Sequence, residues 1–158
     1  MKIAVLRETA THERRVAATP ETAKKFIALG AEVAVERGAG AHAAIADADY
    51  ETAGAAVADR ASVLAGADIV LAVQGPDAAE LAGAKPGAWL VASLNPFAER
   101  ARVEGYAAAG IEALAMEFMP RITRAQSMDI LSSQSNLSGY RAVLEAAHHY
   151  GRAFPMMM

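Results

Sequence analysis

Residues 67–73 have the sequence Ala67-Asp68-Ile69-Val70-Leu71-Ala72-Val73, a nearly continuous apolar run. This pattern is typical of a strand that is covered on both faces, whereas a strand with one solvated face alternates apolar and polar residues. Strands covered on both faces belong mostly to parallel sheets, because the crossover helices lie against both sides. The run therefore predicts an α/β fold in which it forms a buried strand of a parallel sheet.

Shorter segments before and after this run repeat an alternation of strand and helix. Further strands are predicted at residues 2–6, 32–36, 86–93 and 111–116. Helices are predicted from Thr19-Pro20 to Gly30, at 47–53, at 61–65, from Asn95-Pro96 to Gly110, and from Asn136 to about Gly151. A Thr or Asn cap before proline marks a helix start, and glycine commonly follows a helix end. The order predicts a doubly wound, Rossmann- or flavodoxin-like parallel sheet followed by a long C-terminal helix.

Composition narrows the class of protein. The chain has 158 residues, of which 54% are hydrophobic, enough for a domain with a buried core. Fifteen basic and 18 acidic residues give a net charge of −3, so no basic face for nucleic acid and no polybasic membrane patch is predicted. With no cysteine and no histidine pair at helical ligand spacing, we predict no metal site. The apolar runs are shorter than the ~20 residues that span a bilayer, so we expect a cytoplasmic chain.

A glycine-rich turn follows the strand predicted at 32–36. Its sequence, Gly38-Ala39-Gly40-Ala41-His42-Ala43, matches the pattern G-x-G-x-x-A. Backbone N–H groups in such a turn can bind a pyrophosphate at a helix N-terminus. The alternative is a tight loop that requires glycine for its backbone geometry. We favour the loop, because a separate helix start follows at Asp47 and the isolated motif is weak.

The segment from Met116 to Asn136 has the most unusual composition. It contains two arginines and then several amide and hydroxyl side chains among apolar residues. Gln126 and Asp129 are three residues apart and would share a helix face, with Ser132 or Ser133 one turn later. Such a face can bind a neutral polar group such as a carboxamide. The alternative is a capped connection between helices whose polar groups are solvated.

These motifs resemble those of a known family. Arg7-Glu8, Arg15-Val16-Ala17 and Thr19-Pro20 resemble the opening shared by alanine dehydrogenases, saccharopine-type dehydrogenases and the NAD-binding alpha subunits of proton-translocating nicotinamide nucleotide transhydrogenases. Residues 119–137 and 151–158 are similar to the transhydrogenase version. The resemblance implies that residues 1–135 form the N-terminal domain of this superfamily and that 136–158 form a long helix and the start of a link. It also implies that the second, NAD-binding Rossmann domain is absent from this chain.

The resemblance further implies an activity. In transhydrogenases a hydride passes from NADH to NADP⁺ on another component, coupled to proton translocation. The implied NAD(H)-binding residues are Arg121, Gln126, Asp129, Ser132 and Tyr140. No acid–base catalyst is expected, because a hydride moving directly between two nicotinamides requires proximity and alignment.

The same resemblance implies partners and a location. The expected partners are a membrane proton channel, a component that binds NADP(H), and a second copy of the subunit in a homodimer. The chain would then be cytoplasmic and peripheral to the inner face of the plasma membrane. The isolated chain is expected to be inactive and to bind NAD(H) weakly.

Two alternatives remain. An alanine dehydrogenase-like amino-acid oxidoreductase needs groups that polarise a carbonyl and transfer a proton, for which that family uses a Lys and a His. The matching positions here are Gln74 and Asn95, which do not titrate, although Arg15 matches an arginine that binds substrate carboxylate. The other alternative is a non-catalytic binding module of flavodoxin-like fold.

Overall fold

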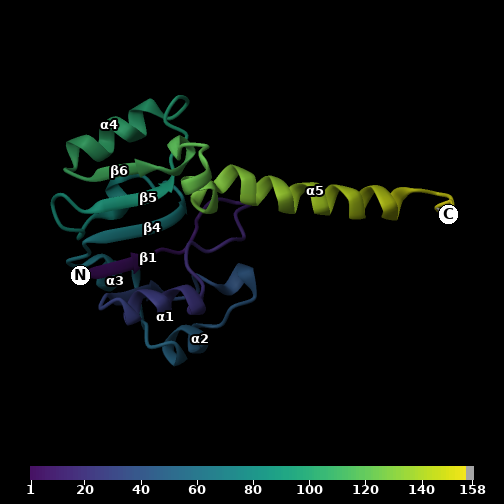
Figure 1. The fold of residues 1–158 in the computed structure, drawn as a ribbon. Helices are drawn as coiled ribbons and strands as arrows, with labels where there is room; N and C mark the ends of the chain where they lie inside the picture. Colours follow the sequence, from purple (N-terminus) through teal and green to yellow (C-terminus); the bar gives the residue numbers. More distant parts are fainter. Residues whose placement is uncertain (156–158) are drawn as a thin grey trace. The chain divides into compact units, whose positions relative to one another are not determined.

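The computed structural model describes residues 1–155, so the end of the predicted segment 136–158 lies outside the described residues. The chain divides into two compact units, Met1–Met116 and Glu117–Met158. The first unit holds the sheet and its helices, and the second holds the polar segment and one long helix (Figure 1). A family-domain boundary at residue 135 stays a prediction.

The sheet of the first unit is entirely parallel. Its strands are β1 (Lys2–Val5), β2 (Glu32–Glu36), β3 (Ala56–Ala58), β4 (Ile69–Gln74), β5 (Trp89–Ser93) and β6 (Glu112–Ala115). They lie in the order β3-β2-β1-β4-β5-β6, and every neighbouring pair is parallel. The doubly wound parallel sheet predicted from the sequence is therefore confirmed, and β4 at its centre contains residues 69–73 of the predicted run.

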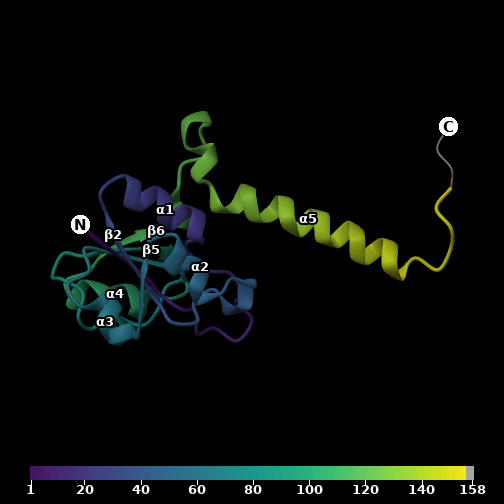
Figure 2. The same cartoon turned by 90° about the horizontal axis from the view of Figure 1, so that it is seen from below.

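Helices cover both faces of this sheet. They are α1 (Pro20–Ala28), α2 (Asp47–Thr52), α3 (Arg60–Leu64) and α4 (Arg100–Ala108), with short 3₁₀ helices η1 (Ala41–Ala43) and η2 (Ala78–Leu81). Figure 2 shows α3 and α4 on the side of the sheet opposite α1. The start of α1 follows the sequence prediction: Thr19 is its N-cap and accepts a hydrogen bond from the Thr22 N–H at 3.3 Å.

Two hydrophobic cores lie on the two faces. Ile3 and Val5 of β1 belong to one core, whereas Ala4 and Leu6 belong to the other, because alternate residues of a strand point to opposite faces. Tyr50 of α2 is fully buried in the first core, and Leu90 of β5 is fully buried in the second. Burying one such large side chain contributes about 1.5–3 kcal/mol to stability. The cores hold the strand ends, and therefore the loops that follow them, in fixed positions.

The predicted start of α4 at Asn95-Pro96 is wrong. The helix begins at Arg100, and Glu99 is its N-cap. Asn95 has a φ of +47°, whereas an N-cap residue is normally extended. Its carbonyl instead accepts hydrogen bonds from the N–H groups of Ala98 and Glu99, at 3.1 and 2.9 Å, which closes a turn before the helix.

The second unit contains 3₁₀ helices η3 (Met116–Phe118, with its first residue in the first unit) and η4 (Thr123–Met128), followed by α5 (Ile130–His149). The long C-terminal helix is confirmed, but it begins at Ile130 and not at Asn136, because Asp129 caps it. None of the residues of α5 is buried. Among residues 1–155, no helix combines the length and the apolar character needed to cross a bilayer.

Candidate functional site

A polar cavity of about 620 Å³ lies at the carboxyl ends of β1 and β4. It is lined by residues 6–13 after β1, by residues 75–77 after β4, by Ala72 and Gln74 of β4, and by Arg60, Glu80 and Arg102. β1 and β4 are neighbours in the middle of the sheet although they are not consecutive strands. The connections after them therefore diverge, and doubly wound sheets bind ligands at this kind of opening.

Glu8 lines the cavity and joins the segment after β1 to the end of β4. Its carboxylate accepts hydrogen bonds from the N–H groups of Val73, at 2.6 Å, and Gln74, at 3.1 Å. Burial raises the pKa of Glu8, while the two backbone hydrogen bonds act in the opposite direction. Both carboxylate oxygens are therefore used to hold the end of β4.

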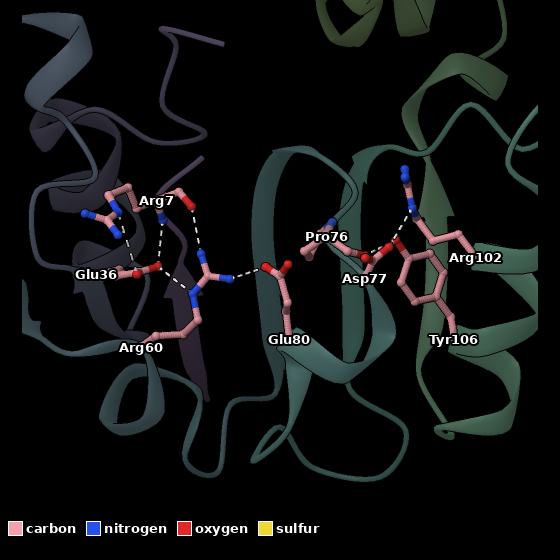
Figure 3. Close-up of polar contacts among 8 residues, drawn as sticks. All are labelled: Arg7, Glu36, Arg60, Pro76, Asp77, Glu80, Arg102 and Tyr106. Atoms are coloured by element: carbon pink, nitrogen blue, oxygen red, sulfur yellow. Dashed lines mark hydrogen bonds and ion pairs between the residues drawn. The ribbon is translucent and has the colours of Figure 1, made fainter. Parts of the chain in front are cut away.

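Arg60, the first residue of α3, forms one wall of the cavity by binding three acceptors (Figure 3). Its guanidinium donates to Glu36 at 3.0 Å, to Glu80 at 2.5 Å and to the Arg7 carbonyl at 2.8 Å. Glu36 is nearly buried and also accepts the Arg7 N–H at 2.9 Å. Arg7 Nε lies 4.0 Å from the other oxygen of Glu36, so two arginines surround this acid, and Arg60 links it to η2 and to the segment after β1.

The other wall is formed by α4 and the turn after β4 (Figure 3). The hydroxyl of buried Tyr106 donates to the Pro76 carbonyl at 2.5 Å, and burial raises the pKa of Tyr106 to about 12. Arg102 donates to Asp77 at 3.2 Å. Gly75 lies against this wall, because an added Cβ would be 2.7 Å from Leu94 and 2.8 Å from the Tyr106 hydroxyl oxygen. The wall is therefore closely packed and polar at its rim.

Glu13 binds Arg15 and Gln74, two of the positions at which the chain was compared with amino-acid dehydrogenases. Arg15 donates to Glu13 through Nε at 2.7 Å and through Nη2 at 2.6 Å. Gln74 donates its side-chain amide to the same carboxylate at 3.1 Å. The paired Arg15 lowers the pKa of Glu13 to about 2. Asn95 lies in the turn before α4 and is exposed.

In the second unit, the structure brings together two of the predicted NAD(H)-binding residues. Asp129 Oδ1 accepts the Leu131 N–H at 2.9 Å, and Oδ2 accepts the Ser132 hydroxyl at 2.6 Å. These bonds, the Ser132 hydroxyl foremost, lower the pKa of Asp129, to which nearby Arg121 also contributes. Asp129 is 8% exposed. Its carboxylate thus caps α5 and ties the preceding polar segment to the start of that helix.

The other predicted binding residues are exposed. Arg121 precedes η4, and Gln126 lies within η4 with its side chain exposed and its carbonyl 3.3 Å from the Asp129 N–H. Tyr140 is 67% exposed on α5. A helix rises about 1.5 Å per residue, which puts Tyr140 roughly 12 Å along α5 from Ser132. Tyr140 is therefore separate from the contact between Asp129 and Ser132.

The glycine-rich turn at 38–43 forms a tight loop. The Gly38 N–H donates to the Asp47 carboxylate at 2.9 Å, so a side chain already uses this N–H. At Gly40 an added Cβ would lie 2.8 Å from the Ile45 side chain. Only the three-residue η1 follows, which is too short to serve as the helix of a pyrophosphate site. These contacts agree with the favoured prediction of a loop.

The sequence prediction did not select Glu8, Glu13, Arg60 or Tyr106. A usable signal was present for Glu8, because charged residues directly after a central strand of a doubly wound sheet lie at the ligand-binding edge. Arg60 and Tyr106 have no comparable signal, since their partners are 20 or more residues away. Among residues 1–155, no group of three potential metal ligands is found.

Comparison with known proteins identifies similar chains. Residues 4–138 match the family model described as alanine dehydrogenase/PNT, N-terminal domain. The chain is 51% identical to the first part of NAD(P) transhydrogenase subunit alpha of Rhodospirillum rubrum, with 100% of this chain and 43% of that protein covered. It is 36% identical to alanine dehydrogenase of Halomonas elongata, with 97% of this chain and 41% of that protein covered.

A solved structure matches the fold closely. The crystal structure of transhydrogenase from Sinorhizobium meliloti superposes with a TM-score of 0.93 at 46% identity, and the match covers 100% of this chain and 47% of that one. The chain therefore spans less than half the length of the relatives it matches.

Proposed function

Because the chain belongs to the family of alanine dehydrogenase/PNT N-terminal domains, we propose that it is the amino-terminal part of the NAD(H)-binding component of an NAD(P) transhydrogenase. The observation that carries this proposal is the higher identity, over the entire chain, to transhydrogenase subunits than to alanine dehydrogenase. Transfer of a hydride from NADH to NADP⁺, coupled to proton translocation, would then be the activity of the complete assembly.

The polar segment of the second unit provides groups that suit a nicotinamide. The carboxamide of a nicotinamide has one acceptor and two N–H donors, and the Arg121 guanidinium and the Gln126 amide can bind these groups. We propose that these two residues contact the nicotinamide end of NAD(H). NADH, when bound, supplies the hydride, and the chain supplies orientation.

Asp129 and Ser132 are proposed to support this contact from α5. Both oxygens of Asp129 are hydrogen-bonded at the start of α5, to the Leu131 N–H and the Ser132 hydroxyl. The pair would therefore fix the end of the segment that carries Gln126. Tyr140 is proposed to contact the bound nucleotide from further along the same helix.

The partners follow from the same family argument. We propose that the chain works with a component that binds NADP(H), with a membrane proton channel, and with a second copy of itself in a homodimer. This assembly would place it at the cytoplasmic, inner face of the plasma membrane. Because the chain covers 43% of its relative from R. rubrum, the adenosine and pyrophosphate contacts are proposed to come from sequence that corresponds to the rest of that protein.

Replacement of Gln126 tests the proposal. With Gln126→Ala introduced into the native gene, the rate at which NADH reduces thio-NADP⁺ in native membranes should fall roughly 10- to 100-fold, because small displacements of a reacting ring spoil its alignment. NADH affinity should change less than the rate. The control is Gln134→Ala, which removes the same side chain from α5 and should retain the rate.

Two further measurements separate the alternatives. Titration calorimetry of the 158-residue chain with NADH should detect no binding in the micromolar range. An alanine dehydrogenase would oxidise NADH in the presence of pyruvate and ammonia, which we do not expect because Gln74 and Asn95 cannot transfer protons. Pyruvate-dependent oxidation without reduction of thio-NADP⁺ would refute the proposal.

A further inference from the structure

Arg124 is an exposed arginine without a partner in the part of the chain that the structure describes. It lies in η4, and its guanidinium has no hydrogen bond or ion pair to another of residues 1–155. Arg60, in contrast, is held by two carboxylates. Arg121, three residues before Arg124, lies near Asp129 and contributes to the lowered pKa of that acid. The guanidinium of Arg124 is therefore available to another molecule.

The stretch around Arg124 is basic and partly apolar. Residues 118–128 contain two arginines and no aspartate or glutamate, although the whole chain has a net charge of −3. Within this stretch, Ile122 is 56% exposed and Met128 is 50% exposed. Arginine and methionine are enriched in the contact surfaces of protein complexes, whereas lysine and the acids are depleted. The composition of the stretch 118–128 is therefore that of a protein-binding surface.

The backbone that carries Arg124 is held in place by its neighbours. Ala125 is 4% exposed, and its N–H donates to the Ile122 carbonyl at 2.9 Å. Successive residues of a 3₁₀ helix are about 120° apart, so Arg124 and Gln126 project on the two sides of buried Ala125. After η4, the Asp129 N–H lies 3.3 Å from the Gln126 carbonyl, and the Asp129 carboxylate caps α5. Arg124 is therefore presented from a fixed backbone.

The location of Arg124 gains its meaning from the proposed function, on which this inference rests. Gln126 is proposed to contact the nicotinamide of NAD(H), and a hydride passes directly only between reacting atoms about 3–3.5 Å apart. The NADP(H)-binding component must therefore cover the surface next to Gln126. Consecutive Cα atoms are about 3.8 Å apart, so the Cα atoms of Arg124 and Gln126 are separated by no more than roughly 7.6 Å. A side chain this close to the point of transfer lies within that contact.

We propose that Arg124 binds a carboxylate on the surface of the NADP(H)-binding component and thereby helps to align the two components for hydride transfer. An arginine can give a carboxylate two parallel hydrogen bonds, which fix orientation as well as distance. The exposed side chains of Ile122 and Met128 would pack against apolar groups of the same surface. An anionic membrane is a poorer partner, because its recruitment uses clusters of about four to eight basic residues and the stretch 118–128 has two.

Replacement of Arg124 in the native gene tests the proposal, with the affinity between the purified NAD(H)-binding and NADP(H)-binding components measured by titration calorimetry. In Arg124→Ala the Kd should rise about tenfold and should depend less steeply on salt, because a charged pair is lost. Arg124→Lys keeps the charge without the two parallel hydrogen bonds, so it should retain the salt dependence and lose part of the affinity. Affinity for NADH should be unchanged in both variants. The matched control is Arg37→Ala, which removes an exposed arginine after β2 and should leave the Kd unchanged.

Several results would overturn the role of Arg124. One is an unchanged Kd and salt dependence in Arg124→Ala, and another is an equal rise in Kd in Arg37→Ala. A loss of NADH affinity in Arg124→Ala would place this arginine at the NAD(H) site instead. Binding to vesicles of phosphatidylcholine and phosphatidylserine that Arg124→Ala abolishes would assign the stretch to a membrane. If the unmodified component does not bind the NADP(H)-binding component at all, the proposed function fails too, whereas binding that is independent of Arg124 leaves the proposed function standing.

Discussion

Replacing Arg60 by methionine should destabilise the first unit, because the nearly buried carboxylate of Glu36 would lose its main partner. Arg60 is 24% exposed and the Glu36 side chain is 9% exposed, so their ion pair lies between the buried and the surface limits. Breaking a buried pair costs about 3–5 kcal/mol, whereas an exposed pair is worth about 0–1 kcal/mol. Because Glu36 is nearly buried and the Arg7 carbonyl also loses a donor, we expect Arg60→Met to lower the free energy of unfolding by about 2–4 kcal/mol.

Urea denaturation followed by far-UV circular dichroism and by fluorescence of Trp89 measures this change. Adding Glu36→Gln to Arg60→Met removes the stranded charge, so the double variant should recover about 2 kcal/mol relative to the sum of the two single losses. Arg100→Met is the control: its pair with Glu104 is exposed on α4 and should contribute less than about 0.5 kcal/mol. A loss below about 1 kcal/mol for Arg60→Met, or strict additivity with Glu36→Gln, would show that the reasoning about the buried acid is wrong.

The other predictions concern packing and pH. Gly75→Ala places a Cβ 2.8 Å from the Tyr106 hydroxyl oxygen and should lower the free energy of unfolding, measured by urea denaturation, by about 1–3 kcal/mol. The control is Gly139→Ala on α5, where an added Cβ meets open space and should not lower this free energy. Equal losses in the two variants would contradict the prediction. Arg15 lowers the pKa of Glu13 to about 2, below the ordinary value of 4.5, so the ionised carboxylate stabilises the fold above pH 4.5 and this contribution is lost as the pH falls from 4.5 towards 2. The unfolding free energy of Glu13→Gln should therefore depend less on pH in that window, and an unchanged slope would disprove the assignment.

The main features of the fold could be predicted because short local sequence patterns indicate them. The apolar run that forms β4 and the Thr19-Pro20 start of α1 each contain their own signal. β3 was not predicted, because its three residues, Ala56–Ala58, are too few to show a period and two are alanine. The error at Asn95 has a physical reason as well: the same dipeptide can open a helix or, with a positive φ, a turn.

The candidate site was less accessible to sequence reasoning. The polar segment around Gln126 and Asp129 was singled out by composition, and the structure adds that Asp129 caps α5, so its carboxylate is already hydrogen-bonded. The contact between Glu13 and Gln74 depends on how β1 and β4 pair, which neither segment encodes alone. Side chains that meet across a sheet can be located only after the strand order is known.

Part of the cavity at the carboxyl ends of β1 and β4 is open because β1 ends before β4 does. β1 ends at Val5, which pairs with Leu71, while β4 continues to Gln74. On the β1 side, the last amides of β4 therefore have no strand partner, and the carboxylate of Glu8 accepts their hydrogen bonds instead. The difference in strand length thus leaves the end of β4 open to a side chain from the loop that follows β1. Extending β1 far enough to pair with the end of β4 would put peptide backbone where the Glu8 carboxylate now lies.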